Sequence, residues 1–117
     1  MFVIYVAGPY KGSNAWEIEK NIRHAEAYAK SIWQLGAVGL CPHTNNRFFY
    51  GSFSEDTAFR GCVELLHRSD AIFMCPGWEG STGSKDERDE AMLLGIPVFY
   101  SLEGLAIWLK AAEQNDG

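Results

Sequence analysis

Apolar residues in this chain fall into short continuous runs that are separated by longer amphipathic segments. The first run, residues 2–7, is continuous, which is typical of a strand buried on both faces of a sheet. Three further runs, at residues 37–41, 71–75 and 97–100, are also short enough to be strands. Between them, apolar residues recur every three or four positions, which is the spacing of one helix face. The pattern therefore predicts alternating strands and helices.

Each predicted helix begins at a polar residue that can cap its first turn. The expected caps, in chain order, are Ser13 or Asn14, Ser52 or Ser54, Ser84, and Ser101. Residues 42–53 and 76–83 carry no helical periodicity and are rich in residues that favour loops, so both segments are predicted to be loops.

One acid lies on the apolar side of the third helix. At about 100° per residue, Glu87 shares a face with Ala91 and Leu94. Burying an unpaired carboxylate is costly or raises its pKa, so its position needs a reason. In one interpretation Ser84 caps the helix and Glu87 completes a capping box. In the other interpretation, Glu87 faces a pocket and takes part in catalysis. Local pattern alone favours the cap, and the two interpretations are compatible.

Strands that alternate with helices indicate a parallel sheet covered by helices on both faces. With right-handed crossovers, the 117 residues favour a single domain over residues 1–117 with an α/β flavodoxin-like (Rossmann-like) three-layer sandwich. Its parallel sheet should have four or five strands in the order 2-1-3-4. Ligands of such folds bind beyond the carboxyl ends of the strands, which here are followed by residues 8–10, 42–53 and 76–83.

The first two of these loops have both a functional and an ordinary explanation. Gly8-Pro9-Tyr10 allows a ligand to approach the backbone, but it matches neither a P-loop nor a dinucleotide fingerprint and could be a simple turn. In the second loop, His43, Asn45, Asn46 and Arg47 could recognise a polar ligand, or they could reflect the usual polarity of a loop.

The third loop leads into the helix that carries Glu87. Its residues, among them Ser81 and Gly83, should offer backbone N–H groups at a helix start, which is an anion site by geometry. Trp78 could stack on a base, or it could lie at the edge of the core.

Composition narrows the function classes. Apolar residues make up 47% and charged residues 21%, as in an ordinary globular protein. The net charge of -5 argues against binding to a nucleic-acid polymer, although a single nucleotide needs only local donors. No apolar run reaches the ~20 residues of a membrane span. The chain begins without a basic leader, so we expect a cytoplasmic protein that does not bind membranes.

The cysteines predict no metal site. Cys41, Cys62 and Cys75 are odd in number, follow no metal-binding spacing and lie beside apolar residues, as reduced core cysteines do. Cys41-Pro42-His43 could begin a metal site, but no second pair of ligands completes it.

Three motifs together resemble the nucleoside 2-deoxyribosyltransferase superfamily, which includes the 2'-deoxynucleoside 5'-monophosphate N-hydrolases. They are Gly8-Pro9-Tyr10, Ser69-Asp70-Ala71, and Gly83-x-x-x-Glu87-x-x-x-Ala91-x-x-x-Gly95-x-Pro97-Val98. The similarity covers residues 2–100, and the register of residues 78–87 is closer to a subgroup of small phage and bacterial members.

The resemblance implies that Glu87 is a nucleophile that attacks C1' of a deoxyribose and releases the base. Water would then resolve the glycosyl-enzyme ester in a hydrolase, or a second base in a transferase, with hydrolysis favoured here. The helix start should keep Glu87 ionised through its partial positive charge. The substrate-binding positions implied by the resemblance and the loops are Gly8, Pro9, Tyr10, His43, Asn45, Trp78, Ser81, Gly83 and Ser84.

The chain departs from the family at one position. Where the family carries an Asp on the helix before the third strand, this sequence has Cys62, with Asp56 and Glu64 as candidate auxiliary acids nearby. A nucleotide-binding or sensing module that lacks turnover is therefore the alternative function. A flavodoxin-like signalling domain is disfavoured, because no acidic pair follows the first strand.

The resemblance also predicts what the protein binds and how it assembles. The resemblance implies a nucleoside or nucleotide substrate, no metal or organic cofactor, and a homodimer or larger homo-oligomer. Leu93, on the polar face of its helix, is a candidate subunit contact. The aromatic residues Trp16, Trp33, Phe48, Phe49 and Tyr50 could form an interface or a lid.

Overall fold

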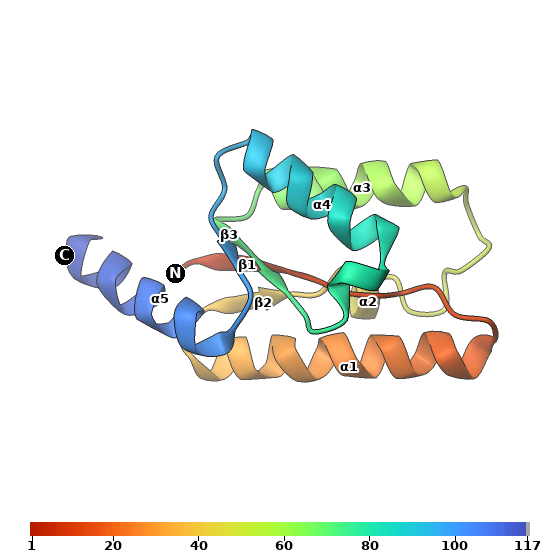
Figure 1. Cartoon of the computed structure of the whole chain (residues 1–117), viewed down its shortest axis with the longest axis horizontal. Helices are drawn as coiled ribbons and strands as arrows, with labels where there is room; N and C mark the ends of the chain where they lie inside the picture. Colours follow the sequence, from red (N-terminus) through yellow and green to blue (C-terminus); the bar gives the residue numbers. More distant parts are fainter. Residues whose placement is uncertain (117) are drawn as a thin grey trace.

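The computed structural model describes residues 1–116 and has three layers, with helices on both sides of a sheet (Figure 1). In the described chain the sheet has four parallel strands in the order β2-β1-β3-β4. The strands are β1 (Val3–Ala7), β2 (Val38–Leu40), β3 (Ala71–Met74) and β4 (Val98–Phe99). The predicted flavodoxin-like fold class and the predicted strand order are therefore confirmed.

The helices follow the predicted alternation with two short additions. They are α1 (Ala15–Gln34), α2 (Pro42–Asn45), α3 (Glu55–His67), α4 (Thr82–Leu93), α5 (Leu102–Asp116) and a 3₁₀ turn, η1 (Trp78–Gly80). The predictions that residues 42–53 and 76–83 form only loops are wrong, because α2 lies in the first segment, and η1 and the start of α4 lie in the second. The first residue of α2 is a proline, whose fixed φ suits the first turn of a helix.

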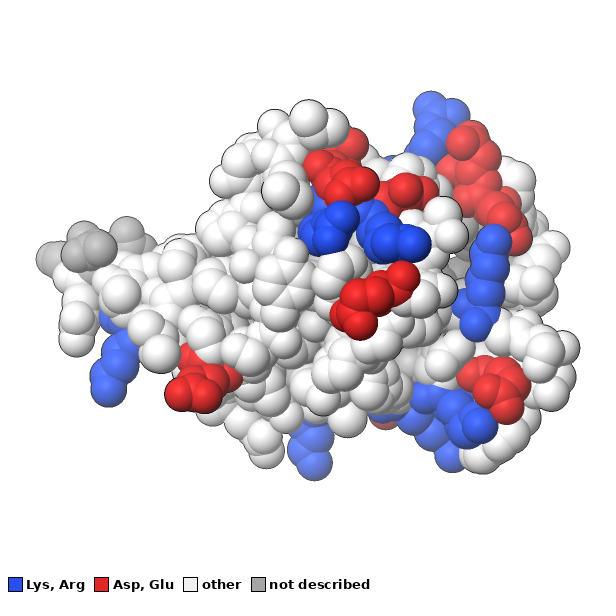
Figure 2. Space-filling view, viewed as in Figure 1, with Lys and Arg blue, Asp and Glu red and all other residues white. Residues whose placement is uncertain are grey.

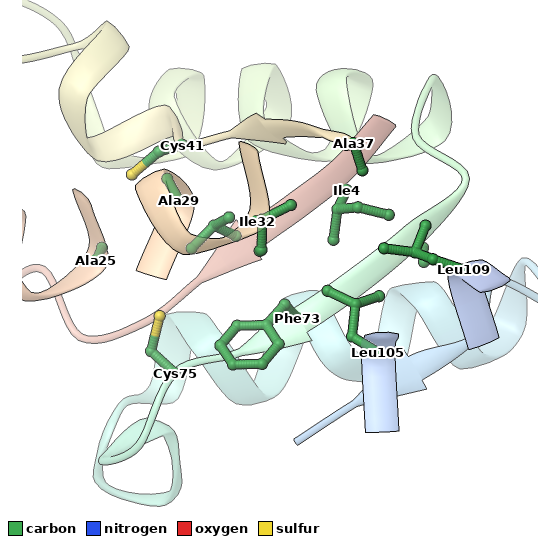
Figure 3. Close-up of a cluster of buried hydrophobic side chains, with 12 residues drawn as sticks. Ile4, Ala25, Ala29, Ile32, Ala37, Cys41, Phe73, Cys75, Leu105 and Leu109 are labelled. Atoms are coloured by element: carbon green, nitrogen blue, oxygen red, sulfur yellow. The ribbon is translucent and has the colours of Figure 1, made fainter. Parts of the chain in front are cut away.

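The alternation of β1 side chains divides the core into two clusters. Ile4 and Val6 point to the face that α1 and α5 cover, where they join Phe73 of β3 in one cluster (Figure 3). Tyr5 and Ala7 point to the opposite face, which α3 and α4 cover. The continuous apolar run thus reflects a strand that is buried on both sides, as the sequence predicts.

The contact between α1 and β2 requires a glycine. A Cβ atom on Gly39 would lie 2.5 Å from the carbonyl oxygen of Ala29 and 3.0 Å from its Cα atom. Because these atoms belong to the backbone of α1, they cannot move aside as a flexible side chain would. Gly39 therefore lets the helix pack directly on the edge strand of the sheet.

Three of the predicted caps are found. The Asn14 side chain accepts a hydrogen bond from the backbone N–H of Glu17 at 2.9 Å. Ser54 and Ser101 accept from backbone N–H groups in the same way at the starts of α3 and α5. These bonds satisfy donors that a helix start leaves without partners, so they fix where α1, α3 and α5 begin.

The surface shows no continuous basic area on the face drawn in Figure 2, where blue and red side chains lie next to one another. Oppositely charged side chains also form ion pairs, such as Arg68 with Glu64 at 2.7 Å. None of the helices in residues 1–116 combines the length and the apolar character needed to cross a membrane.

Candidate active site

A cleft of about 890 Å³ opens beyond the carboxyl ends of the central strands. Its walls come from the loop that follows β1, from the segment between α2 and α3, and from the start of α4. This is the point where the strand order reverses, since β1 pairs with β2 on one side and with β3 on the other. The cleft therefore occupies the position at which open parallel sheets bind ligands.

Glu87 lies on α4 at the floor of this cleft and is 8% exposed to solvent. The hydroxyl of Tyr5, a fully buried residue of β1, donates a hydrogen bond to Glu87 Oε2. This bond joins two residues that are 82 positions apart in the chain. The acid on the apolar side of the helix thus has a partner from the central strand and also faces the cleft.

Burial raises the pKa of Glu87 to about 7, and the negative charge of Asp86 acts in the same direction. The hydrogen bond from Tyr5 opposes this rise, because it favours the ionised carboxylate. Burial and the neighbouring Glu87 raise the pKa of Tyr5 well above its ordinary value, so the phenol keeps its proton and remains a donor. Near neutral pH, both the ionised and the protonated form of Glu87 are therefore populated.

Two expectations about Glu87 need correction. Ser81, and not Ser84, caps α4, since its side chain accepts a hydrogen bond from the backbone N–H of Ser84 at 3.2 Å. Glu87 consequently lies in the second turn of α4 and is not a capping-box residue. The partial charge of the helix start does not dominate there, because burial raises the pKa rather than lowering it. Leu94, predicted on the buried face, is 40% exposed.

Ser84 lies one turn before Glu87 and is 1% exposed. It lines the cleft, and its hydroxyl has no hydrogen-bond partner among the described residues. Cys62 of α3 also lines the cleft, and it packs against the cluster that contains Tyr5. Burial raises the pKa of the Cys62 thiol, so the group is neutral at pH 7 and does not replace an aspartate charge.

His43 ties α2 to the loop that follows β1. Its Nε2 atom lies 3.0 Å from the carbonyl oxygens of Gly8 and Pro9. Burial lowers the pKa of His43, so the ring is neutral at pH 7 and its Nε2–H donates to these carbonyls. Tyr10 packs edge-on against this ring at 5.2 Å between centroids. The three loop residues and His43 therefore form one wall of the cleft.

Aromatic side chains extend this wall, since the rings of Tyr10 and Tyr50 lie 6.3 Å apart between centroids. Four of them line the cleft from the segment before α3 and from α3 itself: Phe49, Tyr50, Phe53 and Phe59. Arg47 holds the start of this segment against α1 through ion pairs with Glu19 and, at 3.6 Å, with Glu26. Flat apolar rings on a cleft wall suit a flat aromatic ligand.

The sequence is matched over residues 2–100 by the family model described as a domain of unknown function, DUF4406. The chain belongs to this family. No curated protein matches the sequence.

The DUF4406 chain is also similar to a solved structure of a 2-deoxyribosyltransferase from the psychrotolerant bacterium Bacillus psychrosaccharolyticus. The TM-score is 0.62 and the sequence identity is 21%, over 82% of this chain and 69% of that chain. At this identity the likeness shows the fold. It confirms, at the level of the fold, the resemblance to the nucleoside 2-deoxyribosyltransferase superfamily.

The cleft of this DUF4406 domain brings together most of the candidate site residues that the sequence suggests. Those that line it are Gly8, Pro9, Tyr10, His43, Ser81, Gly83, Ser84 and Glu87. Asn46, which the sequence also suggests, lines the cleft as well. Residues of the cleft that the sequence did not single out include Tyr5, Lys11, Phe53, Glu55, Phe59, Thr82 and Asp86. Tyr5 carried a signal, because a phenol within a fully buried strand needs a hydrogen-bond partner.

Five candidates do not line the cleft of the DUF4406 domain, and one of them is Arg47, which pairs with Glu19 and Glu26. Asn45 is exposed and donates to the side chain of Asn46. Trp78 packs against Tyr100, with 5.5 Å between ring centroids. The candidate auxiliary acids, Asp56 and Glu64, are exposed and pair with arginines on the outer side of α3.

The described part of the chain holds no group of three His, Cys, Asp or Glu side chains that could bind a metal ion. Cys41, Cys62 and Cys75 are free thiols, and Cys41 and Cys75 are buried, as the sequence predicts for core cysteines.

Proposed function

We propose that this protein is an N-glycosidase that cleaves the bond between base and deoxyribose in 2'-deoxynucleosides or their 5'-monophosphates. Glu87 is the nucleophile, and hydrolysis is favoured over transfer to a second base. The observation that carries the proposal is a buried carboxylate, held by the Tyr5 hydroxyl, at the floor of the cleft where parallel sheets bind ligands. The likeness of fold to a 2-deoxyribosyltransferase supports the same reaction class.

The chemistry follows from the position of the carboxylate. In the first step an oxygen of ionised Glu87 forms a bond to C1' while the bond from C1' to the base nitrogen breaks. The base leaves with that electron pair and takes up a proton. In the second step water attacks C1', loses a proton, and releases Glu87 and the free sugar. The Tyr5 hydroxyl holds one carboxylate oxygen, so the other is available for attack.

The walls of the cleft suit the two parts of the substrate. In this proposal the base lies against the aromatic residues Phe49 and Tyr50, and the sugar lies beside the start of α4, where Ser81, Gly83 and Ser84 line the cleft. The resemblance to the nucleoside 2-deoxyribosyltransferase superfamily implies that Ser81 and Gly83 match the loop where its hydrolases hold a 5'-phosphate. Gly8, Pro9, Tyr10 and His43 complete the pocket. No cofactor takes part in this proposal.

A direct experiment is to incubate the protein with a panel of 2'-deoxynucleosides and their 5'-monophosphates and to chromatograph the products for free base. Wild type should release base, and Glu87→Ala should abolish the release. Glu90→Ala is the matched control, since Glu90 lies on the same helix but outside the cleft. Absence of free base with every compound would refute the enzyme proposal.

The alternative is a nucleotide-binding or sensing module without turnover. Cys62 is the observation that favours it, because its neutral thiol stands where the nucleoside 2-deoxyribosyltransferase superfamily, which the sequence resembles, carries an aspartate. This alternative predicts that deoxynucleotides raise the melting temperature of both wild type and Glu87→Gln, while no free base appears with either protein.

We also propose that the protein acts as a homodimer or larger homo-oligomer in the cytoplasm, on a small molecule rather than a nucleic-acid polymer. Leu93 is 83% exposed on α4 and is a candidate subunit contact. Three free thiols suit a reducing compartment. Light scattering of wild type and Leu93→Glu tests the assembly, because a charged residue at a subunit contact should lower the molar mass.

A further inference from the structure

The Ser84 hydroxyl is a buried polar group without a partner among the described residues. Two other serines within helices or at their ends donate to the carbonyl oxygen four residues earlier: Ser69 to Leu65 at 2.9 Å, and Ser31 to Ala27 at 3.2 Å. The residue four positions before Ser84 is Gly80, which precedes the cap of α4. The helix therefore offers Ser84 no carbonyl of this kind.

Buried hydroxyls in folded proteins nearly always have a hydrogen-bond partner, because an unpaired one is costly. Ser84 is 1% exposed, and it lines the cleft on the same face of α4 as Glu87, three residues further on. A group that a bound ligand places at this point would supply the missing partner. The position of Ser84 therefore indicates a contact with the part of the ligand that lies nearest the nucleophile.

The charges around Ser84 favour a neutral group over an anion. Asp86 and Glu87 both line the cleft beside it. Among the described lining residues, Lys11 is the one lysine or arginine, and its Nζ atom lies 2.9 Å from Glu55 Oε2. A phosphate at Ser84 would face carboxyl groups without an unpaired cation nearby. A sugar hydroxyl carries no charge, and it can both donate to and accept from a serine hydroxyl.

We propose that the Ser84 hydroxyl binds one of the two sugar hydroxyls of a 2'-deoxynucleoside, at O3' or O5', and so selects the sugar whose C1' faces Glu87. This inference rests on the proposed N-glycosidase function. It assigns to Ser84 a role in substrate specificity that is separate from the capping role of Ser81 and from the nucleophilic role of Glu87.

The test compares Ser84→Ala with wild type on a 2'-deoxynucleoside that wild type cleaves, and on its 3'-deoxy and 5'-deoxy analogues. Ser84→Ala should raise KM for the parent compound roughly tenfold, the effect of one lost hydrogen bond to a buried group. The analogue that lacks the partner hydroxyl should raise KM for wild type by a similar factor, with no further rise for Ser84→Ala. An unchanged KM for Ser84→Ala would overturn the inference.

Thermal stability without ligand provides a second readout that a purely structural serine would not give. Because Ser84 has no partner to lose, Ser84→Ala should keep or raise the melting temperature. Ser69→Ala is the matched control. Its buried hydroxyl donates to Leu65 away from the cleft, so this variant should lower the melting temperature and leave KM unchanged. A lower melting temperature for Ser84→Ala would show a partner within the protein and would also overturn the inference.

The two proposals fail in different ways. If wild type releases base but Ser84→Ala behaves like wild type, the inference about Ser84 fails and the proposed function survives. If wild type releases no base, the proposed function fails, and the same compounds are titrated calorimetrically into Glu87→Gln and into Glu87→Gln with Ser84→Ala. Weaker binding by the double variant supports the Ser84 contact, and equal binding or no binding overturns it.

Discussion

Replacing Glu87 by glutamine should make the protein more stable at neutral and alkaline pH while removing its nucleophile. The glutamine carbonyl can still accept the hydrogen bond from the Tyr5 hydroxyl, so the packing between β1 and α4 is retained. What the substitution removes is a carboxylate that burial disfavours in its charged form. Catalysis and stability should therefore change in opposite directions.

The magnitude follows from the pKa of Glu87. Its ordinary value of 4.5 rises to about 7 in the folded protein, so the folded state holds its proton more tightly than the unfolded state. Each pKa unit corresponds to about 1.4 kcal/mol, and the rise is therefore equivalent to about 3 kcal/mol. This cost is absent below pH 4.5, grows as pH rises to about 7, and is constant above that pH.

The assay is urea denaturation followed by tryptophan fluorescence, since the chain contains four tryptophans. The free energy of unfolding of Glu87→Gln minus that of wild type should increase by about 3 kcal/mol between about pH 4 and pH 8. For a domain of this size the difference is equivalent to roughly 10 °C in melting temperature. Glu79→Gln is the control, because Glu79 is exposed and its substitution should leave the pH dependence of wild type unchanged.

A constant difference across this pH range would refute the reasoning, because it would mean that Glu87 titrates alike in the folded and unfolded states. A difference that decreases with rising pH would mean that the folded protein favours ionised Glu87. The helix start or the Tyr5 hydroxyl would then dominate over burial.

Three further variants test the surroundings of Glu87 and the packing of the fold. Tyr5→Phe removes the donor that favours the carboxylate, so the acid limb of the pH–kcat/KM profile should move above pH 7; an unmoved limb would contradict a role for Tyr5 in holding the charge. Cys62→Asp places a carboxylate beside Tyr5 and Glu87. The like charge should also move the acid limb of the pH–kcat/KM profile upward and lower the free energy of unfolding. Cys62→Ser adds no charge and should leave the acid limb in place. Gly39→Ala should destabilise the protein by about 1–3 kcal/mol in urea denaturation, because the added methyl group meets the Ala29 backbone; a loss below this range would mean that α1 can shift away from β2.

The fold could be predicted because its signals are local and repeated. The run at residues 2–7 is apolar without interruption, and the structure shows why, since Ile4 and Tyr5 point into different core clusters. Asn14 and Ser54 begin their helices as predicted, because each accepts a hydrogen bond from a backbone N–H three residues later. The strand order then follows from right-handed crossovers between parallel strands.

The start of α4 was predicted wrongly because its sequence offers two serines three residues apart. The Ser-x-x-Glu spacing favours Ser84 as the cap, whereas in the structure Ser81 caps the helix and Ser84 is its third residue. Which serine caps the helix depends on the path of the chain from β3 through η1 into α4, and no local sequence pattern predicts this path. The one-turn shift moves Glu87 away from the helix end, and burial then determines its pKa.

Contacts between distant segments account for the rest. The partner of Glu87 is 82 residues away, and the fold alone brings it there. Trp78 occurs in a loop beside the cleft, yet its ring packs against Tyr100, and the guanidinium of Arg88 lies 4.7 Å from the ring centroid. Sequence position gave no reason to prefer this packing over stacking on a ligand.

The most direct test of the central proposal is the intact mass of the protein after rapid mixing with a 2'-deoxynucleoside that it cleaves, followed by acid quenching. We predict a transient species heavier by one deoxyribosyl group, with the group mapped by peptide sequencing to Glu87 and absent from Glu87→Gln. Release of free base with no adduct on any residue at any mixing time would contradict a covalent role for Glu87. An adduct on a different residue would mean that Glu87 is not the nucleophile.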